Sequence, residues 1–138
     1  MAAVDTFGIV GTVIAEKYQA MVMLGQANSR MKDFFDLAVI ARRTELDGAT
    51  LAAAIAATFA RRQTALPTER PLALTQQFSE DAAKLRQWQA FLNKNHIEAA
   101  SLGETVALLD DLLWPPTQVA AAGSQATATW RPEALRWV

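Results

Sequence analysis

The chain has 138 residues, which is enough for one domain with a hydrophobic core and too short for two domains of ordinary size. Apolar residues make up 51%, charged residues 20%, and the formal net charge is −1, so the composition argues against a disordered chain and against a globally basic nucleic-acid-binding surface. The chain has no cysteine, which excludes disulfides and thiolate chemistry.

Targeting and membrane segments are not indicated by the sequence. No apolar run approaches the roughly 20 residues that a membrane span needs. The N-terminal run contains Asp5 and has no basic residues ahead of it, which is atypical of a signal peptide. We therefore expect a cytoplasmic protein that does not bind membranes.

The first predicted elements are two helices that form a hairpin. Thr12 is a predicted N-cap for a helix that ends at Gly25. Asn28 or Ser29 is a predicted N-cap for a second helix, over about residues 30–43. The short connection between them favours antiparallel packing.

A third helix is predicted after Asp47 and Gly48, over residues 50–63, because its apolar residues recur at spacings of three and four. Its high alanine content also favours a helix. Pro67 and Pro71 then predict an irregular connector that separates the two halves of the chain.

Two more helices are predicted in the second half. Ser79 is the predicted N-cap of a helix over residues 80–95. Ser101 and Glu104 form a capping box for the next helix. The run Trp114, Pro115 and Pro116 is expected to stop that helix.

The predicted fold class is all-α, because no alternating strand pattern is present. We expect a bundle of about five helices that begins with a helical hairpin. The helical domain is predicted over residues 1–114, and an irregular Pro/Ala-rich tail over residues 115–138.

Lys17 is the most unusual residue of the first helix, because it lies within an otherwise apolar arc. Such a lysine can extend to solvent, pair with Asp33 or Asp36 across the hairpin, or face a cleft that binds an anion. Asp33 lies at the edge of the apolar arc of the second helix, where the helix dipole and an ion pair with Arg30 compete with a functional role. Periodicity leaves these alternatives open.

The two helices of the hairpin carry a longer pattern of charged and aromatic residues. It reads Glu-Lys-x-x-Ala and then Arg-x-Lys-Asp-aromatic-aromatic-Asp-Leu, with matches at Glu16, Lys17, Ala20, Arg30, Lys32, Asp33, Phe34, Phe35, Asp36 and Leu37. This pattern resembles two conserved blocks of the AbiEii/AbiGii toxin family of nucleotidyltransferases. The resemblance continues more loosely over about residues 10 to 114.

The resemblance implies nucleotide transfer from an NTP with Mg²⁺, by a toxin that acts opposite an antitoxin. It implies that Lys17 contacts the nucleotide or its phosphates and that Asp33 completes the active site, so both are candidate catalytic residues. Arg30 and Lys32 join Lys17 as candidate nucleotide- or phosphate-binding residues, and both are explained equally well as solvated charges on the helix surface. A lysine at a cleft can neutralise charge in phosphoryl chemistry. Asp36 is expected to pair with Lys32 instead of taking part in the reaction.

The family's metal-binding half, with its Asp-x-Asp strand, has no counterpart in this sequence. Only eleven residues precede Thr12, and their one acidic residue, Asp5, has no carboxylate partner. His96 is the only histidine, so no metal site is predicted. We therefore expect the helical C-terminal portion of such a toxin, inactive alone. Mg²⁺ and NTP are implied for the complete enzyme, and neither is expected to bind this chain tightly.

Two functions of different class follow. The first is this portion of a nucleotidyltransferase toxin, whose partners would be the missing N-terminal half or a cognate antitoxin, with a tRNA-like acceptor for the complete enzyme. The second is a helical module that only binds an antitoxin or associates with itself as a homodimer.

Overall fold

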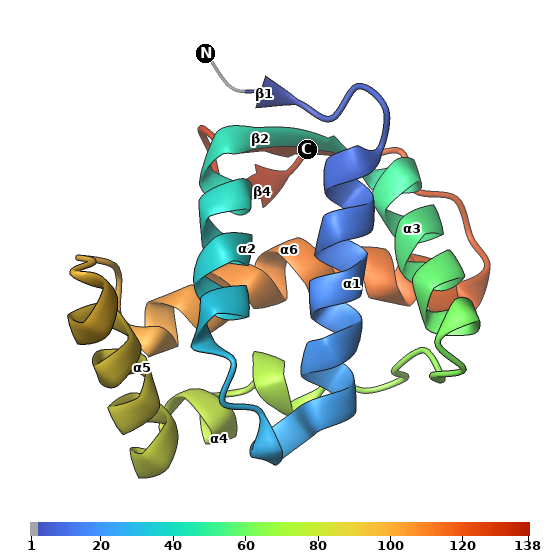
Figure 1. Cartoon of the computed structure of the whole chain (residues 1–138). Coiled ribbons are helices and arrows are strands. Elements are labelled where there is room, and N and C mark those ends of the chain that lie inside the picture. Colours follow the sequence, from blue (N-terminus) through green and yellow to red (C-terminus); the bar gives the residue numbers. More distant parts are fainter. Residues whose placement is uncertain (1–2) are drawn as a thin grey trace.

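The structure is a computed structural model that describes residues 3–138. Within this range it is mainly helical (Figure 1). Its α-helices are α1 (Ile9–Leu24), α2 (Met31–Arg43), α3 (Gly48–Arg61), α4 (Gln76–Ser79), α5 (Ala82–Asn95) and α6 (Leu102–Ala122). Two 3₁₀ helices, η1 (Gly25–Ala27) and η2 (Leu72–Leu74), lie between them, and the strands are β1 (Ala3–Val4), β2 (Thr44–Asp47), β3 (Thr129–Arg131) and β4 (Arg136–Trp137).

The N-terminal hairpin is confirmed: α1 and α2 run in opposite directions and are joined by η1 (Figure 1). The predicted cap of α1 is wrong, because the helix begins at Ile9 and Asp5 caps it. The two carboxylate oxygens of Asp5 accept hydrogen bonds from Val10 N at 3.0 Å and Gly11 N at 2.8 Å. The acidic residue ahead of α1 therefore satisfies backbone donors at a helix start.

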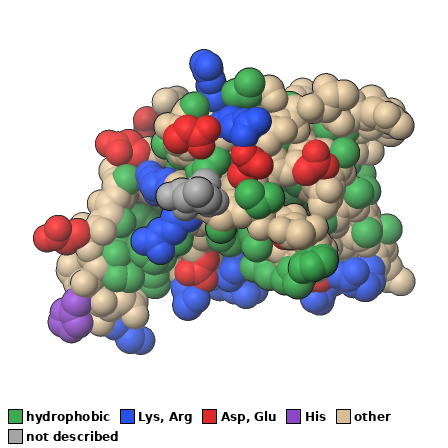
Figure 2. Space-filling view, turned by 90° about the horizontal axis from the view of Figure 1, so that it is seen from above, with side chains coloured by type: hydrophobic (Ala, Val, Ile, Leu, Met, Phe, Trp, Pro, Cys, Tyr) green, Lys and Arg blue, Asp and Glu red, His purple; other side chains and the backbone are tan. Residues whose placement is uncertain are grey.

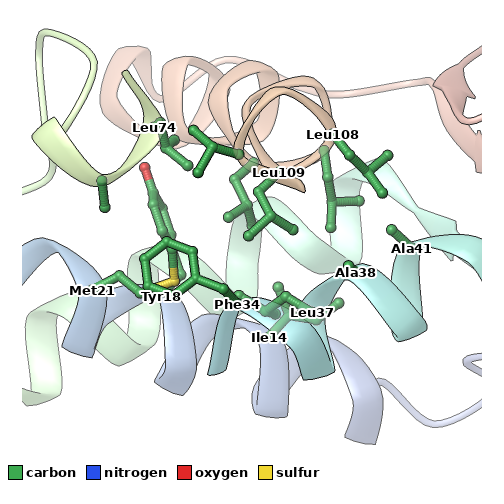
Figure 3. Packing of buried hydrophobic residues seen from close by; sticks show 14 of the residues in the cluster. Ile14, Tyr18, Met21, Phe34, Leu37, Ala38, Ala41, Leu74, Leu108 and Leu109 are labelled. Atoms are coloured by element: carbon green, nitrogen blue, oxygen red, sulfur yellow. The ribbon is translucent and has the colours of Figure 1, made fainter. Parts of the chain in front are cut away.

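The core lies where α1, α2 and α3 meet α6, which crosses behind them (Figure 1). Figure 3 shows side chains of α1 and α2 facing Leu108 and Leu109 of α6. The Tyr18 hydroxyl shares a hydrogen bond with Thr117 Oγ1 at 2.9 Å, so the polar end of this buried ring is satisfied. Burial raises the pKa of Tyr18 to about 12. The tyrosine therefore stays neutral at physiological pH.

Four short strands form a small sheet that the sequence did not predict. Its order is β1-β2-β3-β4, with β1 parallel to β2 and the other neighbours antiparallel. Trp130 on β3 is fully buried, and its Nε1 donates to Ala41 O at 2.8 Å, near the C-terminal end of α2. The C-terminal segment is therefore folded onto the helices as a hairpin.

The expected stop of the last helix at Trp114, Pro115 and Pro116 is wrong, because α6 continues to Ala122. The predicted boundary between residues 114 and 115 falls inside this helix. Proline lacks an N–H, so Pro115 and Pro116 leave the carbonyls of Asp111 and Leu112 without their usual helical donors. Trp137 Nε1 lies 3.1 Å from Asp111 O and 3.2 Å from Leu112 O and supplies a donor to both.

The start of α5 also differs from the sequence prediction. Asp81 caps this helix by accepting from Lys84 N at 3.1 Å, and Ser79 instead ends α4. Leu85 of this helix is 45% exposed, whereas its neighbour Lys84 is only 3% exposed. Helix α5 therefore turns a lysine into the interior.

Candidate functional site

The candidate site lies between α1 and the N-terminal end of α2. Helix α1 carries Lys17, and α2 carries Lys32, Asp33 and Asp36. Arg30 occupies the N-cap position, directly before α2. Residues i and i+3 share a helix face, so Asp33 and Asp36 can both reach across to α1. The antiparallel hairpin brings them opposite Lys17.

Lys17 is held by two carboxylates. Its Nζ donates to Asp33 Oδ1 at 3.0 Å and to Asp36 Oδ2 at 3.2 Å. The side chain of Lys17 is 24% exposed, and that of Asp33 only 7%. Partial burial lowers the pKa of Lys17, but the hydrogen bonds and charges of Asp33 and Asp36 outweigh this effect, so its pKa is raised. The lysine is therefore charged at physiological pH.

The second oxygen of Asp33 is less well satisfied. Asp33 Oδ2 lies 3.2 Å from Arg30 Nε, within ion-pair distance, but receives no hydrogen bond from any residue that the structure describes. A buried carboxylate oxygen without a hydrogen bond carries a free-energy cost. Asp33 therefore retains an acceptor that is free for a further donor.

Lys32 lies outside the Lys17 ion pairs. Its Nζ pairs with Asp36 Oδ2 at 2.6 Å, as expected for an i,i+4 pair, and its side chain is 73% exposed. Lys17, Asp33 and Arg30 meet in one cluster, and Asp36 joins Lys32 to it. Lys32 also lines a second groove together with Arg30 and Asp33.

A groove of about 340 Å³ opens beside this cluster. Its charged lining residues are Lys17, Arg30, Asp33, Glu16 and Arg62. The side chains of Arg30 and Arg62 are more than half exposed. Three cations therefore reach a groove that also contains two carboxylates, so its charged lining is net positive and favours an anion over a cation.

Glu16 is a site residue whose contacts the sequence did not indicate. Its carboxylate accepts from Arg61 and, at 2.9 Å, from Arg62 Nη2, which joins α1 to the end of α3. Burial raises the pKa of Glu16, but these two guanidinium groups outweigh it and lower the pKa below its usual value. Glu16 and Arg61 are 45 positions apart in the sequence, so no local pattern indicates this contact.

The residues from 3 to 138 do not fit a divalent metal. They contain no group of three or more His, Cys, Asp or Glu side chains that could hold an ion. Asp33 and Asp36 are both engaged by lysine ammonium groups.

None of the helices within residues 3–138 is long and apolar enough to span a membrane.

Comparison with known proteins identifies the family. The family model described as nucleotidyl transferase AbiEii toxin, of a type IV toxin–antitoxin system, matches residues 10–113. Neither the curated proteins nor the solved structures gave a match. The matched region contains α2, all of α1 except Ile9, the whole Lys17 cluster, and most of the residues in the helices that pack around it. The chain therefore belongs to the AbiEii toxin family of nucleotidyl transferases.

Proposed function

We propose that this chain supplies the lysine-bearing half of a nucleotidyltransferase site in a cytoplasmic toxin, and that nucleotide phosphates bind Lys17 in the groove between α1 and α2. The observation that carries this proposal is the position of Lys17, held at the groove by two carboxylates. Family membership supports the reaction class.

The hydrogen-bonding capacity of Lys17 supports phosphate binding. A lysine ammonium has three N–H donors, and the structure gives Nζ two acceptors, Asp33 Oδ1 and Asp36 Oδ2. The third donor is free for a phosphate oxygen that enters the groove. Because the two carboxylates already fix the ammonium, little further ordering is needed when the phosphate binds.

Arg30 and Arg62 extend the positive charge along the groove. Both line it, and both have side chains that are exposed enough to move toward a bound phosphate. Their present partners, Asp33 and Glu16, compensate the charges of these two arginines. We propose that Asp33 orients Lys17 and that its Oδ2, which is buried and pairs with Arg30 in the structure, accepts a hydrogen bond from a substrate hydroxyl once Arg30 has moved toward the phosphate.

No step of this proposal passes through a metal, because the described residues do not fit one. We propose that the complete enzyme uses Mg²⁺ and an NTP and that another polypeptide segment provides the metal ligands, so that the chain is inactive alone. A tRNA-like acceptor for the complete enzyme and a cognate antitoxin remain part of the same proposal.

The test is equilibrium binding of each Mg-NTP to the chain and to two variants that each remove one cation. Lys17→Ala should abolish saturable binding, because it removes the phosphate contact. Arg86→Ala is the control: Arg86 is exposed on α5 and lines neither of the two grooves that Arg30 and Asp33 line, so the variant should bind as the original chain does. Equal binding by Lys17→Ala, or no binding by the original chain at millimolar nucleotide, would refute the proposal.

A second function, self-association, is favoured by apolar side chains at the start of α1. Phe7 is 86% exposed, Ile9 66% and Val4 59%, and they follow one another along β1 and the first turn of α1. Figure 2, which looks down on this end of the molecule, shows hydrophobic side chains on the surface among charged ones. Such a patch promotes dimerisation. Light scattering at high concentration tests this, and a monomer mass would exclude it.

A further inference from the structure

Lys84 on α5 is a buried lysine that the proposed site does not use directly. It is 3% exposed, and its Nζ donates to Asn28 O at 2.6 Å and to Gln87 Oε1 at 3.2 Å. The Phe78 ring lies 5.4 Å from Nζ. No carboxylate within the described residues forms an ion pair with it. Burying a charge without a counter-ion costs free energy that an apolar side chain would avoid.

The acceptor of Lys84 is the turn that leads into α2. Asn28 is 1% exposed, and its N–H donates to Gly25 O at 3.1 Å. Its side chain turns back on the chain, because Asn28 Oδ1 accepts from Arg30 N at 2.8 Å. Lys84 therefore holds the backbone of a residue whose side chain in turn holds Arg30.

Arg30 needs this support because of its backbone. It precedes α2 with φ −84° and ψ 68°, outside the helical region, and its side chain makes no capping hydrogen bond to the helix. From this position Arg30 Nε reaches Asp33 Oδ2 at 3.2 Å, and Asp33 Oδ1 accepts from Lys17. A continuous series of contacts thus runs from Lys84 through Asn28, Arg30 and Asp33 to Lys17.

We propose that Lys84 is a positioning residue for the Lys17 site: by fixing the Asn28 turn, it sets the backbone of Arg30 so that the guanidinium meets Asp33 and the groove. This inference rests on the proposed function for its effect on nucleotide binding. It also makes a statement about Arg30 that does not depend on any nucleotide.

The test compares Lys84→Met with Trp88→Phe. Methionine fills similar space without donating to Asn28 O. Trp88 is also buried on α5, and its Nε1 donates to Ala100 O at 3.2 Å, so Trp88→Phe removes a buried hydrogen bond of the same helix that does not touch the Asn28 turn. Thermal unfolding shows how far each variant is destabilised, and binding is compared where both are folded.

Two readouts separate positioning from general stability. The NMR signals of Arg30 N–H and Nε–H should shift in Lys84→Met and remain unchanged in Trp88→Phe. The dissociation constant for Mg-NTP should rise about tenfold in Lys84→Met only, which corresponds to about 1.4 kcal/mol. If Lys84→Met does not fold, Lys84→Gln takes its place: its donor lies one bond nearer the helix backbone, which weakens the donation to Asn28 O, so the Arg30 signals should shift in the same direction.

Either of two results would overturn the inference. Unchanged Arg30 signals in the folded Lys84 variant would show that Lys84 does not set this turn. Equal changes in the Lys84 variant and Trp88→Phe would show a purely structural effect. Failure of the proposed function is recognised separately, because the original chain would then bind no nucleotide while the Arg30 signals still report on Lys84.

Discussion

Lys17 and Asp33 are 16 positions apart in the sequence and form a 3.0 Å hydrogen bond that joins α1 to α2. Asp36 and Arg30 complete this cluster. The pair lies partly below the surface, so each partner compensates for the desolvation of the other.

A double-mutant cycle should measure this coupling. Lys17→Met removes the counter-ion of a buried carboxylate and should destabilise the chain by about 1–3 kcal/mol, less than for a fully buried pair because Lys17 is partly exposed. Asp33→Asn should lower the unfolding free energy less in the Lys17→Met background than in the original chain. The difference, which is the coupling free energy, should be about 1–2 kcal/mol. Urea unfolding of both single variants and the double variant gives these values. Strict additivity would show that the pair does not stabilise the fold.

The Lys17 cluster should also make stability depend on pH in the alkaline range. The pKa of Lys17 is raised above its ordinary value of 10.5, so folding favours the protonated form. Its contribution should be complete below pH 10.5 and should decrease as pH rises through the higher folded pKa. Tyr18, with a pKa of about 12, titrates in the same range. The difference between the original chain and Lys17→Met therefore isolates the lysine, and a difference that stays constant across this range would contradict the assignment.

Trp137 should stabilise α6 through the two carbonyls that Pro115 and Pro116 leave free. Trp137→Phe removes the indole donor and should cost about 1–2 kcal/mol of unfolding free energy. The matched background is Pro115→Ala with Pro116→Ala, which restores both backbone N–H groups, so that Trp137→Phe should cost less there. An equal cost in both backgrounds would mean that Trp137 stabilises the chain by packing alone.

The sequence predicts the hairpin well because local signals agree there. Met31, Phe34 and Leu37 recur at helical spacing and are buried, and Asp33 lies at the edge of the core as expected. The family pattern brought Lys17 and Asp33 together as candidates, which periodicity alone could not do. The sequence therefore predicts which residues belong to this cluster.

The remaining features depend on contacts between distant residues. Helix α6 continues through its two prolines, and Trp137 supplies a donor to the carbonyls of Asp111 and Leu112 from 26 and 25 positions away. Hydrophobic patterning does not predict that Lys84 is buried, because the acceptor that satisfies it is a backbone carbonyl 56 positions away. The strands have two to four residues each, too short for an alternating pattern to be visible.

Asp111 should destabilise the chain at neutral pH. Burial and then the charge of Asp110 raise the pKa of Asp111 above its ordinary value of 3.8, with Arg70 opposing them. The protonated form is thus favoured by folding, and the stability it gives is lost as pH rises through the folded pKa. Asp111→Asn should raise the unfolding free energy at neutral pH by less than about 1 kcal/mol, because solvent screens this exposed carboxylate.

The same substitution should have no effect well below pH 3.8, where Asp111 is protonated in both the folded and the unfolded chain. Glu80→Gln removes another exposed carboxylate and serves as the control, with no gain expected at either pH. A gain for Asp111→Asn that persists in acid would assign the effect to packing and not to charge.

The central claim is that Lys17 contacts nucleotide phosphates, and the most direct measurement is an NMR titration of the chain with each Mg-NTP that follows the Lys17 ammonium signal. We predict saturable shifts centred on Lys17, Arg30 and Asp33, lost in Lys17→Ala and retained in Arg86→Ala. An unchanged Lys17 signal at millimolar concentrations of all four nucleotides would contradict the account.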